Sequence, residues 1–375
     1  MNILHLVKTL KAENVRLDVD AERLLCYLPD DGYQMPKALQ LAIKNNKASL
    51  IQFLRDVKKT ASKSADIFPV QRNQAGYLLS SQQERLWFID QLEQGLDYTY
   101  NNVGTVHFEG KLDAALLERC FNAVVARHES LRTRFFSVDS KPLQAIDEQV
   151  VIELPVVDIS QSSDILDDEV QQYLNLQEQT HAKHLFDLAE GRLLKITLLK
   201  LSDVEHVLLL NIHHIISDGW SVRVLFEELT AFYKAFSNAP HNGELPLTPL
   251  SLQYLDYAAW QRQRTKHGDF KPHLQYWQKQ LADMPAMLEL ATDYPRPAVQ
   301  DFRGCSAKFE ISKVLHDKLH TLSVQNGATL FMTLLSGFNI LLWRYTQQTD
   351  LLVGTPIANR NKAELEGLIG FFVNT

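Results

Sequence analysis

A nearly continuous apolar run at residues 206–212, His-Val-Leu-Leu-Leu-Asn-Ile, constrains the fold more than any other segment of the chain. Apolar residues at consecutive positions, rather than at every second one, are typical of a β-strand that is buried on both faces. Such a strand needs a covering layer on each side, and helical patterns alternate with strand-like runs in the region around it. The sequence therefore predicts a layered α/β (α+β) fold.

Two histidines, His213 and His214, directly follow this run, and Ile-Ile-Ser-Asp-Gly follows them. Because successive side chains of a strand point to opposite faces, one ring can enter a cavity while the other packs behind it. Gly219 permits backbone angles that other residues resist, and Ser221 is placed to cap an amphipathic helix over residues 221–236. An imidazole at such a junction can act as a general base or as a hydrogen-bond donor near neutral pH.

Charge and metal-ligand spacing argue against several other functions. The formal net charge is −7 and no basic stripe occurs, whereas nucleic-acid grooves need clustered lysine and arginine. The three cysteines are far apart and odd in number, which predicts neither a disulfide framework nor a zinc site. His181 and His184 have HxxH spacing, but no further ligands lie nearby in the sequence, so we expect a solvated helix face and no metal.

No segment predicts a membrane span or a secretion signal. The longest apolar stretch, residues 328–343, carries polar residues and falls short of the ~20 apolar residues of a span, so we predict a buried core helix. The N-terminus is interrupted by charged residues and lacks a signal-peptide core. We therefore expect a cytoplasmic chain with no nucleic-acid or membrane partner.

The chain divides into segments of different character. Residues 1–57 carry one helical pattern, two strand-like runs joined by a tight polar junction, and two further helical patterns, which predicts an αββαα unit. A unit this small has a marginal core and often gains stability by dimerising or by binding a partner. Residues 58–75 have the composition of a linker. We predict two lobes after it, residues 76–245 and 246–375.

Five segments occur in the order of the motifs of a known family. They read SSQQERLW at residues 80–87, RHESLRTRF at 127–135, HHIISDGWS at 213–221, YLDYAAWQ at 254–261 and IGFFVNT at 369–375. The region resembles the condensation domains of nonribosomal peptide synthetases, relatives of chloramphenicol acetyltransferase, although Gln82 stands where alanine is usual. Residues 1–57 separately resemble the N-terminal docking domains of the tubulysin-synthetase type.

The resemblance implies a fold and a reaction. Family members form two acetyltransferase-like lobes in a V-shaped arrangement with a tunnel between them. Donor and acceptor carrier proteins present their substrates on phosphopantetheine arms, and no cofactor is bound intrinsically. The acceptor amine attacks the donor thioester, so that an amide bond forms. Relatives continue beyond the position of Thr375, so we expect an incomplete second lobe and a fragment of a larger synthetase subunit that need not turn over alone.

The resemblance also assigns roles to the residues of the histidine motif. His214 is expected to face the tunnel as the catalytic base or as a positioning group, and this choice stays open. His213 and Asp218 are expected to be structural, with Asp218 holding its loop through an arginine pair, and Gly219 is expected to keep space beside the substrate. The candidate partners of Asp218 are Arg132 and Arg134. The candidate tunnel-lining residues are Ser217, Trp220, Ser221 and Asn374.

The docking resemblance implies recruitment of an upstream synthetase subunit. We expect recognition by strand addition along the predicted hairpin, and the docking unit could also form a homodimer. The candidate partner-binding residues are Val15, Leu17, Val19, Leu25 and Tyr27. Two alternatives remain: the chain is a non-catalytic docking or binding module, or it is a stand-alone acyltransferase that uses coenzyme A thioesters. The amino acids that are joined, the product and the donor subtype, beyond a preference for an L-configured donor, are not specified by the sequence.

Overall fold

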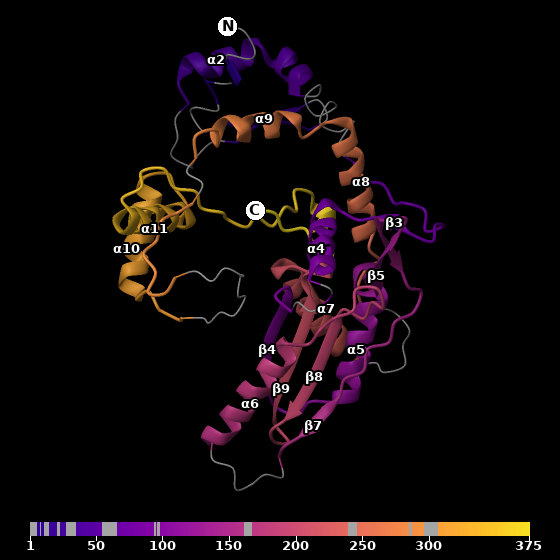
Figure 1. Cartoon of the computed structure of the whole chain (residues 1–375). Coiled ribbons are helices and arrows are strands. Elements are labelled where there is room, and N and C mark those ends of the chain that lie inside the picture. The colour runs from indigo at the N-terminus through magenta and orange to yellow at the C-terminus, as the bar shows by residue number, and fades with distance from the viewer. Residues whose placement is uncertain are drawn as a thin grey trace. The chain divides into compact units, whose positions relative to one another are not determined.

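The chain folds into two compact units, Met1–Phe68 and Pro69–Thr375, and each is described by itself (Figure 1). The division falls inside the predicted linker, residues 58–75. The computed structural model describes residues 6–7, 9–10, 15–20, 23–27, 35–54, 66–93, 95, 98–160, 167–238, 246–284, 287–295 and 307–375.

The first unit contains the predicted β-hairpin. Strands β1 (Arg16–Asp20) and β2 (Arg23–Tyr27) pair in antiparallel register, with Val19 opposite Leu24. Helix α2 (Lys37–Asn45) begins directly after Pro36, and residues 47–54 are also helical. Residues 6–7 and 9–10 are helical as well, so the described residues keep the predicted αββαα order.

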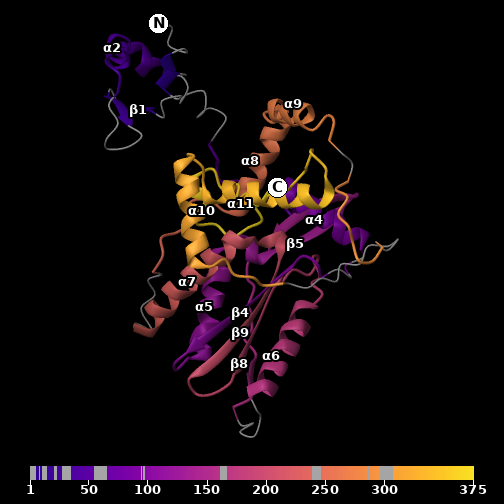
Figure 2. The same cartoon turned by 90° about the vertical axis from the view of Figure 1, so that its left-hand side faces the viewer.

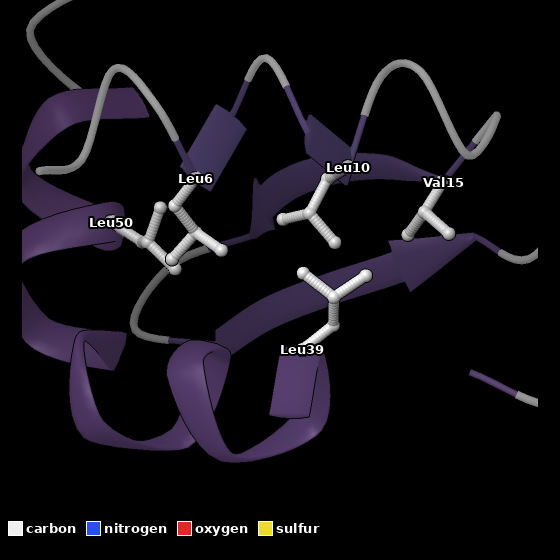
Figure 3. Close-up of a cluster of buried hydrophobic side chains, with 5 residues drawn as sticks. All are labelled: Leu6, Leu10, Val15, Leu39 and Leu50. Atoms are coloured by element: carbon white, nitrogen blue, oxygen red, sulfur yellow. The ribbon is translucent and has the colours of Figure 1, made fainter. Parts of the chain in front are cut away.

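A small leucine-rich cluster forms the core of this unit (Figure 3). The buried side chains are those of Leu6, Leu10, Val15, Leu39 and Leu50. Val15 and Val19 are buried and Leu17 packs against the cluster, because alternate residues of a strand share one face. Val15, Leu17 and Val19 are among the residues predicted to bind a partner by strand addition, and this stays a prediction. The side chains of Leu25 and Tyr27 lie outside the described residues.

The second unit is built around the predicted strand. Strand β9 (Glu205–His213) lies between β4 (Asn101–Glu109) and β8 (Leu194–Lys200), antiparallel to both, and β7 (Val156–Asp158) pairs in parallel with β8. Every residue from 206 to 213 is buried. The prediction of a strand that is buried on both faces is confirmed.

Helices cover both faces of this sheet, as the layered prediction requires (Figures 1 and 2). Helix α6 (Asp167–Ala182) packs its Leu174 against Leu209 of β9. The neighbouring residue of β9, Leu208, faces the helices α5 (Ala114–Arg127) and α7 (Gly219–Asn238), which pack on each other. The histidine pair therefore lies at the end of β9, the strand with the longest run of buried residues among the described strands.

A second, smaller sheet and helix α8 complete this part of the unit. The strand order is β3 (Tyr77–Leu78), β6 (Lys141–Ile146) and β5 (Thr133–Val138), all antiparallel. The accompanying helices are α4 (Ser81–Leu92), the short helix η1 (Glu129–Arg132) and α8 (Tyr254–His267). Helix α8 contacts α4, β3 and η1, so the structure does not divide into compact units at the predicted boundary of residues 245 and 246.

Part of the predicted linker is fixed on this unit. The backbone N–H of Val70 donates to Asp256 Oδ1 at 2.7 Å. Arg72 donates to the same oxygen at 2.6 Å and to Glu129 at 2.7 Å. Residues 69–75 therefore belong to the second unit rather than to a free linker.

Three further helices lie between α8 and the last residues: α9 (Lys271–Gln280), α10 (Lys313–Gln325) and α11 (Leu330–Thr346). The predicted helix over residues 328–343 is thus present, but only Leu342 of α11 is buried. The expectation of a buried core helix is wrong, because the described residues do not cover its apolar side chains. No single described helix could span a membrane; α10 and α11 pass such a test only as a pair bent by 105°.

We predict that Leu50→Ala unfolds the first unit and leaves the second unit folded. Removing a fully buried leucine side chain costs about 2–5 kcal/mol, which is a large share of the stability of so small a core. Leu41→Ala is the matched control, because Leu41 is 58% exposed on α2. Hydrogen exchange measured by mass spectrometry checks this, and equal exchange of residues 35–54 in the two variants would contradict it.

Candidate active site

The two adjacent histidines lie in different surroundings. The ring of His213 is buried and packs edge-on against Phe186, with ring centroids 6.0 Å apart. His214 begins the short helix η2 (His214–Ile216), and its backbone N–H donates to Tyr100 O at 2.8 Å. Its side chain is half-buried and lies against Phe371, with centroids 4.7 Å apart. Of the two rings, His214 is thus the one that solvent reaches.

One hydrogen bond fixes the tautomer of His214. Its Nδ1 lies 2.6 Å from the carbonyl oxygen of Ser217. Because a carbonyl oxygen only accepts, Nδ1 must carry the proton. In the neutral ring the lone pair is then on Nε2, so Nε2 is the atom that can take up a proton or accept a hydrogen bond.

Asp218 organises the start of α7. Its Oδ1 accepts from the backbone N–H of Ser221 at 2.9 Å and from the Ser221 hydroxyl at 2.7 Å. Asp218 is thus the capping residue, and the prediction that Ser221 caps this helix is wrong by three positions. Oδ2 accepts from the backbone N–H groups of Phe372 at 3.0 Å and Val373 at 3.2 Å. The Asp218 carboxylate thus connects the start of α7 to the last residues of the chain.

The arginine that pairs with Asp218 is Arg360. Its Nη2 lies 3.1 Å from Asp218 Oδ1, and the two side chains are 1% and 3% exposed. Its Nη1 donates to the carbonyls of Leu365 at 2.6 Å and Leu368 at 2.7 Å. Burial lowers the pKa of Arg360, whereas the charge and hydrogen bond of Asp218 raise it.

The prediction that Arg132 or Arg134 pairs with Asp218 is wrong. Arg132 donates to the carbonyls of Val125 and Asp147, so that its guanidinium serves the end of α5 and the chain after β6. Arg134 pairs with the carboxylate of Asp147 at 3.1 Å on the surface. Sequence reasoning missed Arg360 because it lies 142 residues from Asp218 and in none of the five motifs.

The last residues of the chain are fixed beside the histidine motif. Tyr254 donates its hydroxyl to Phe371 O at 2.6 Å, and the Ser221 hydroxyl accepts from the Gly370 N–H at 3.0 Å. A Cβ at Gly370 would lie 2.0 Å from a ring carbon of Tyr254, so only glycine fits there. Asn374, predicted to line a tunnel, is exposed and exchanges backbone hydrogen bonds with Ile357 at 2.7 and 3.1 Å.

The remaining predicted residues surround the same junction. Ser217 is buried, and its hydroxyl accepts from the Asn102 amide at 3.4 Å. Trp220 donates its indole N–H to Glu366 O at 2.8 Å. Gly219 opens α7 with φ outside the left-handed region, so it does not use the backbone freedom that glycine permits. A Cβ there would meet no atom within 4 Å, so its position borders open space.

The HxxH pair differs from the prediction. His181 is buried and His184 is half-buried, so the expected solvated helix face is wrong. His184 Nδ1 lies 3.3 Å from the Lys195 ammonium. Within the described ranges no three His, Cys, Asp or Glu side chains converge as metal ligands.

We predict that Asp218→Ala destabilises the second unit by about 3–5 kcal/mol, because it leaves the Arg360 cation buried and unpaired. The double variant with Arg360→Met should recover part of that loss, since both charges are then removed. Arg134→Ala, which breaks a half-exposed pair, should cost less than about 1 kcal/mol. Urea unfolding checks all three, and similar midpoints for Asp218→Ala and Arg134→Ala would refute the prediction.

A family model and several known proteins match the region that contains this site. The condensation domain family model matches residues 73–375. Chondramide synthase cmdD from Chondromyces crocatus is 42% identical over 313 residues, which cover 83% of this chain and 8% of that protein. Surfactin synthase subunit 1 from Bacillus subtilis (strain 168) is 39% identical over 316 residues, 84% of this chain and 8% of that protein. The chain thus spans less than a tenth of the length of these relatives.

Solved structures agree at the level of the fold. The X-domain from teicoplanin biosynthesis superimposes with a TM-score of 0.68 at 28% identity, covering 82% of this chain and 66% of that one. The EpoB cyclization-docking bidomain from Sorangium cellulosum gives a TM-score of 0.72 at 19% identity, covering 99% of this chain and 71% of that one. With the family model matched over most of the chain, the chain belongs to the condensation domain family of nonribosomal peptide synthetases.

Proposed function

We propose that the second unit forms amide bonds between carrier-bound substrates, with His214 as the residue that contacts the reacting groups. The observation that carries this proposal is the fixed tautomer of His214, which keeps a lone pair on Nε2 of a half-buried ring. The Asp218–Arg360 pair holds the loop on which that ring depends. The substrates are a donor acyl or peptidyl thioester and an acceptor aminoacyl thioester, each on the phosphopantetheine arm of a carrier protein, and no resident cofactor is needed.

The proposed step mainly requires that the acceptor amine and the donor thioester are aligned. The acceptor nitrogen attacks the donor carbonyl carbon, the C–N bond forms, the C–S bond breaks, and the amine proton finally resides on the released phosphopantetheine thiol. Holding the two activated reactants in line supplies much of the barrier lowering. Nε2 of His214 can accept the amine proton as a base, or accept a hydrogen bond from the amine and only orient it. Both roles use the same lone pair.

We predict that His214→Ala lowers single-turnover transfer between loaded carriers by about 10²- to 10⁴-fold, the usual contribution of a general base. His214→Asn separates the hydrogen bond that holds the ring from the lone pair on Nε2. The asparagine amide can still donate to Ser217 O but offers no nitrogen lone pair. Loss in both variants identifies Nε2 as the essential atom. Activity in His214→Asn close to that of the unmodified chain would show that the ring serves only to hold the loop.

The assay follows carrier-bound products by intact-protein mass spectrometry. It uses this chain and a form extended past Thr375 to the length of its solved relatives, with Arg134→Ala as the folded surface control. An acyl-coenzyme A donor forms a third arm. Transfer from coenzyme A with none from a carrier would favour the stand-alone acyltransferase, and binding of carriers without any transfer would favour the binding module.

For the first unit we propose docking to an upstream synthetase subunit. The fold supports this, because a solved cyclization-docking bidomain covers 99% of the chain, with the first unit included. Among the described residues β1 and β2 form a two-stranded antiparallel sheet. We propose strand addition along this hairpin as the mode of recognition, since it uses backbone groups and is compatible with the burial of Val15 and Val19. Homodimerisation of this unit and a cytoplasmic setting stay predictions.

We predict that deleting residues 1–57 abolishes association with the C-terminal segment of the upstream subunit and leaves binding of the acceptor carrier unchanged. Both affinities are measured by isothermal titration calorimetry. Leu50→Ala should weaken docking to a similar extent, because the hairpin then loses the core that supports it. Unchanged affinity for the upstream segment after the deletion would exclude docking by this unit.

A further inference from the structure

A buried polar cluster lies between the end of α6 and the strands that lead to the histidine pair. The side-chain amide of Asn211, on β9, donates to His181 O at 2.5 Å. Asn101, at the start of β4, donates to Ala182 O at 2.8 Å and to His184 O at 2.7 Å. Carbonyls at the end of a helix lack intrahelical donors. The two asparagines therefore connect the end of α6 to the sheet.

These hydrogen bonds fix the orientation of both amides. Carbonyl oxygens only accept, so the NH₂ groups must face them, and the Oδ1 atoms of Asn101 and Asn211 must be acceptors. Both Oδ1 atoms are buried and have no partner among the described residues, and the same holds for His181 Nδ1. Native structures seldom leave buried polar atoms unpaired, because each has given up its hydrogen bonds to solvent.

The protonation of the His181 ring determines whether its Nδ1 requires a hydrogen-bond donor or an acceptor as partner. Burial, and then the charges of Lys195 and His184, lower the pKa of His181 to about 4, so the ring is neutral near pH 7. One ring nitrogen is then a donor and the other an acceptor. Nε2 lies 3.4 Å from the hydroxyl of Thr197, which can donate to it. In that arrangement Nδ1 carries the proton and is a buried donor.

We propose that a single internal water molecule binds in this cluster. It donates to Oδ1 of Asn101 and of Asn211, and it accepts the Nδ1–H of His181. With the proton of His181 on Nδ1, the water's two donors and its acceptor match the two acceptors and one donor that are unpaired, and internal waters typically make about three hydrogen bonds. An ammonium ion has only donors and does not fit, because it cannot accept the Nδ1–H.

The water site adjoins the histidine motif. Asn101 pairs with His213 in the register of β4 and β9, and Asn211 lies two residues before it on β9. The bound water joins α6 to both strands at this position and thereby holds the end of β9, where His214 follows. The role in positioning His214 rests on the proposed function, whereas the water site itself does not.

The test begins with the unmodified chain carrying ¹⁵N-labelled histidine. Long-range ¹H–¹⁵N spectra report which nitrogen of His181 is protonated, and a water-selective nuclear Overhauser experiment reports whether a long-lived water lies beside it. We expect the proton on Nδ1 and a cross-peak from that proton to water. A proton on Nε2, or the absence of the cross-peak, would overturn the proposal.

Variants test separately whether the water binds and whether it positions His214. Asn211→Leu removes one acceptor and should abolish the water cross-peak, whereas Leu176→Ala, on the exposed face of α6, should keep it. His181→Asn retains a donor near the position of Nδ1 and His181→Gln does not, so only the first should keep a protected water in a crystal structure. Loss of the water in Asn211→Leu with undiminished carrier-to-carrier transfer would refute the positioning role and leave the water site intact.

Discussion

The buried ion pair of Asp218 and Arg360 is the interaction on which the rest of the site depends. It joins the start of α7 to the last part of the chain, two segments that share no local sequence. The carboxylate uses both oxygens: one accepts from the capped helix and from Arg360, and the other accepts from Phe372 and Val373. Removing either charge leaves the other without compensation in a dry environment, so the pair holds the geometry more than it adds stability.

This fixed geometry explains how two adjacent histidines differ in their surroundings. The strand buries His213 against Phe186, and the turn after the strand leaves His214 half-buried with its Nδ1 committed to Ser217 O. Phe371, brought in by the terminal segment, lies against the His214 ring. The proposed reaction needs an accessible lone pair on a ring that does not rotate, and these contacts together restrict the ring.

The two units reach stability in different ways. The second unit encloses a four-stranded sheet between helical layers, which buries a continuous core around β9. Among the described residues, the core cluster of the first unit has five buried aliphatic side chains, with partly buried hydrophobic residues packed against it. Val15, which directly precedes β1 of the hairpin, belongs to this core.

Local chemistry determined much of this protein from its sequence. The apolar run at residues 206–212 predicts the doubly buried strand, alternation predicts the hairpin, and the motif order predicts the condensation family. Each of these signals depends on near neighbours in the chain, so the pattern of residue types is enough. The start of α7 differs from its predicted position at Ser221, because a serine and an aspartate at a helix start look alike until the backbone shows which side chain accepts the first free N–H.

Tertiary structure alone decided the partner of Asp218, the burial of His181 and the exposure of α11. An ion pair across 142 residues leaves no local pattern, and the motif resemblance pointed to Arg132 and Arg134 instead of Arg360. Burial depends on which elements cover a residue: α6 lies on the sheet and hides His181, whereas the described residues leave most of α11 uncovered. The sequence by itself determined the elements and the chemistry they carry; packing determined which charges meet, because that depends on distances in space that the order of residues does not encode.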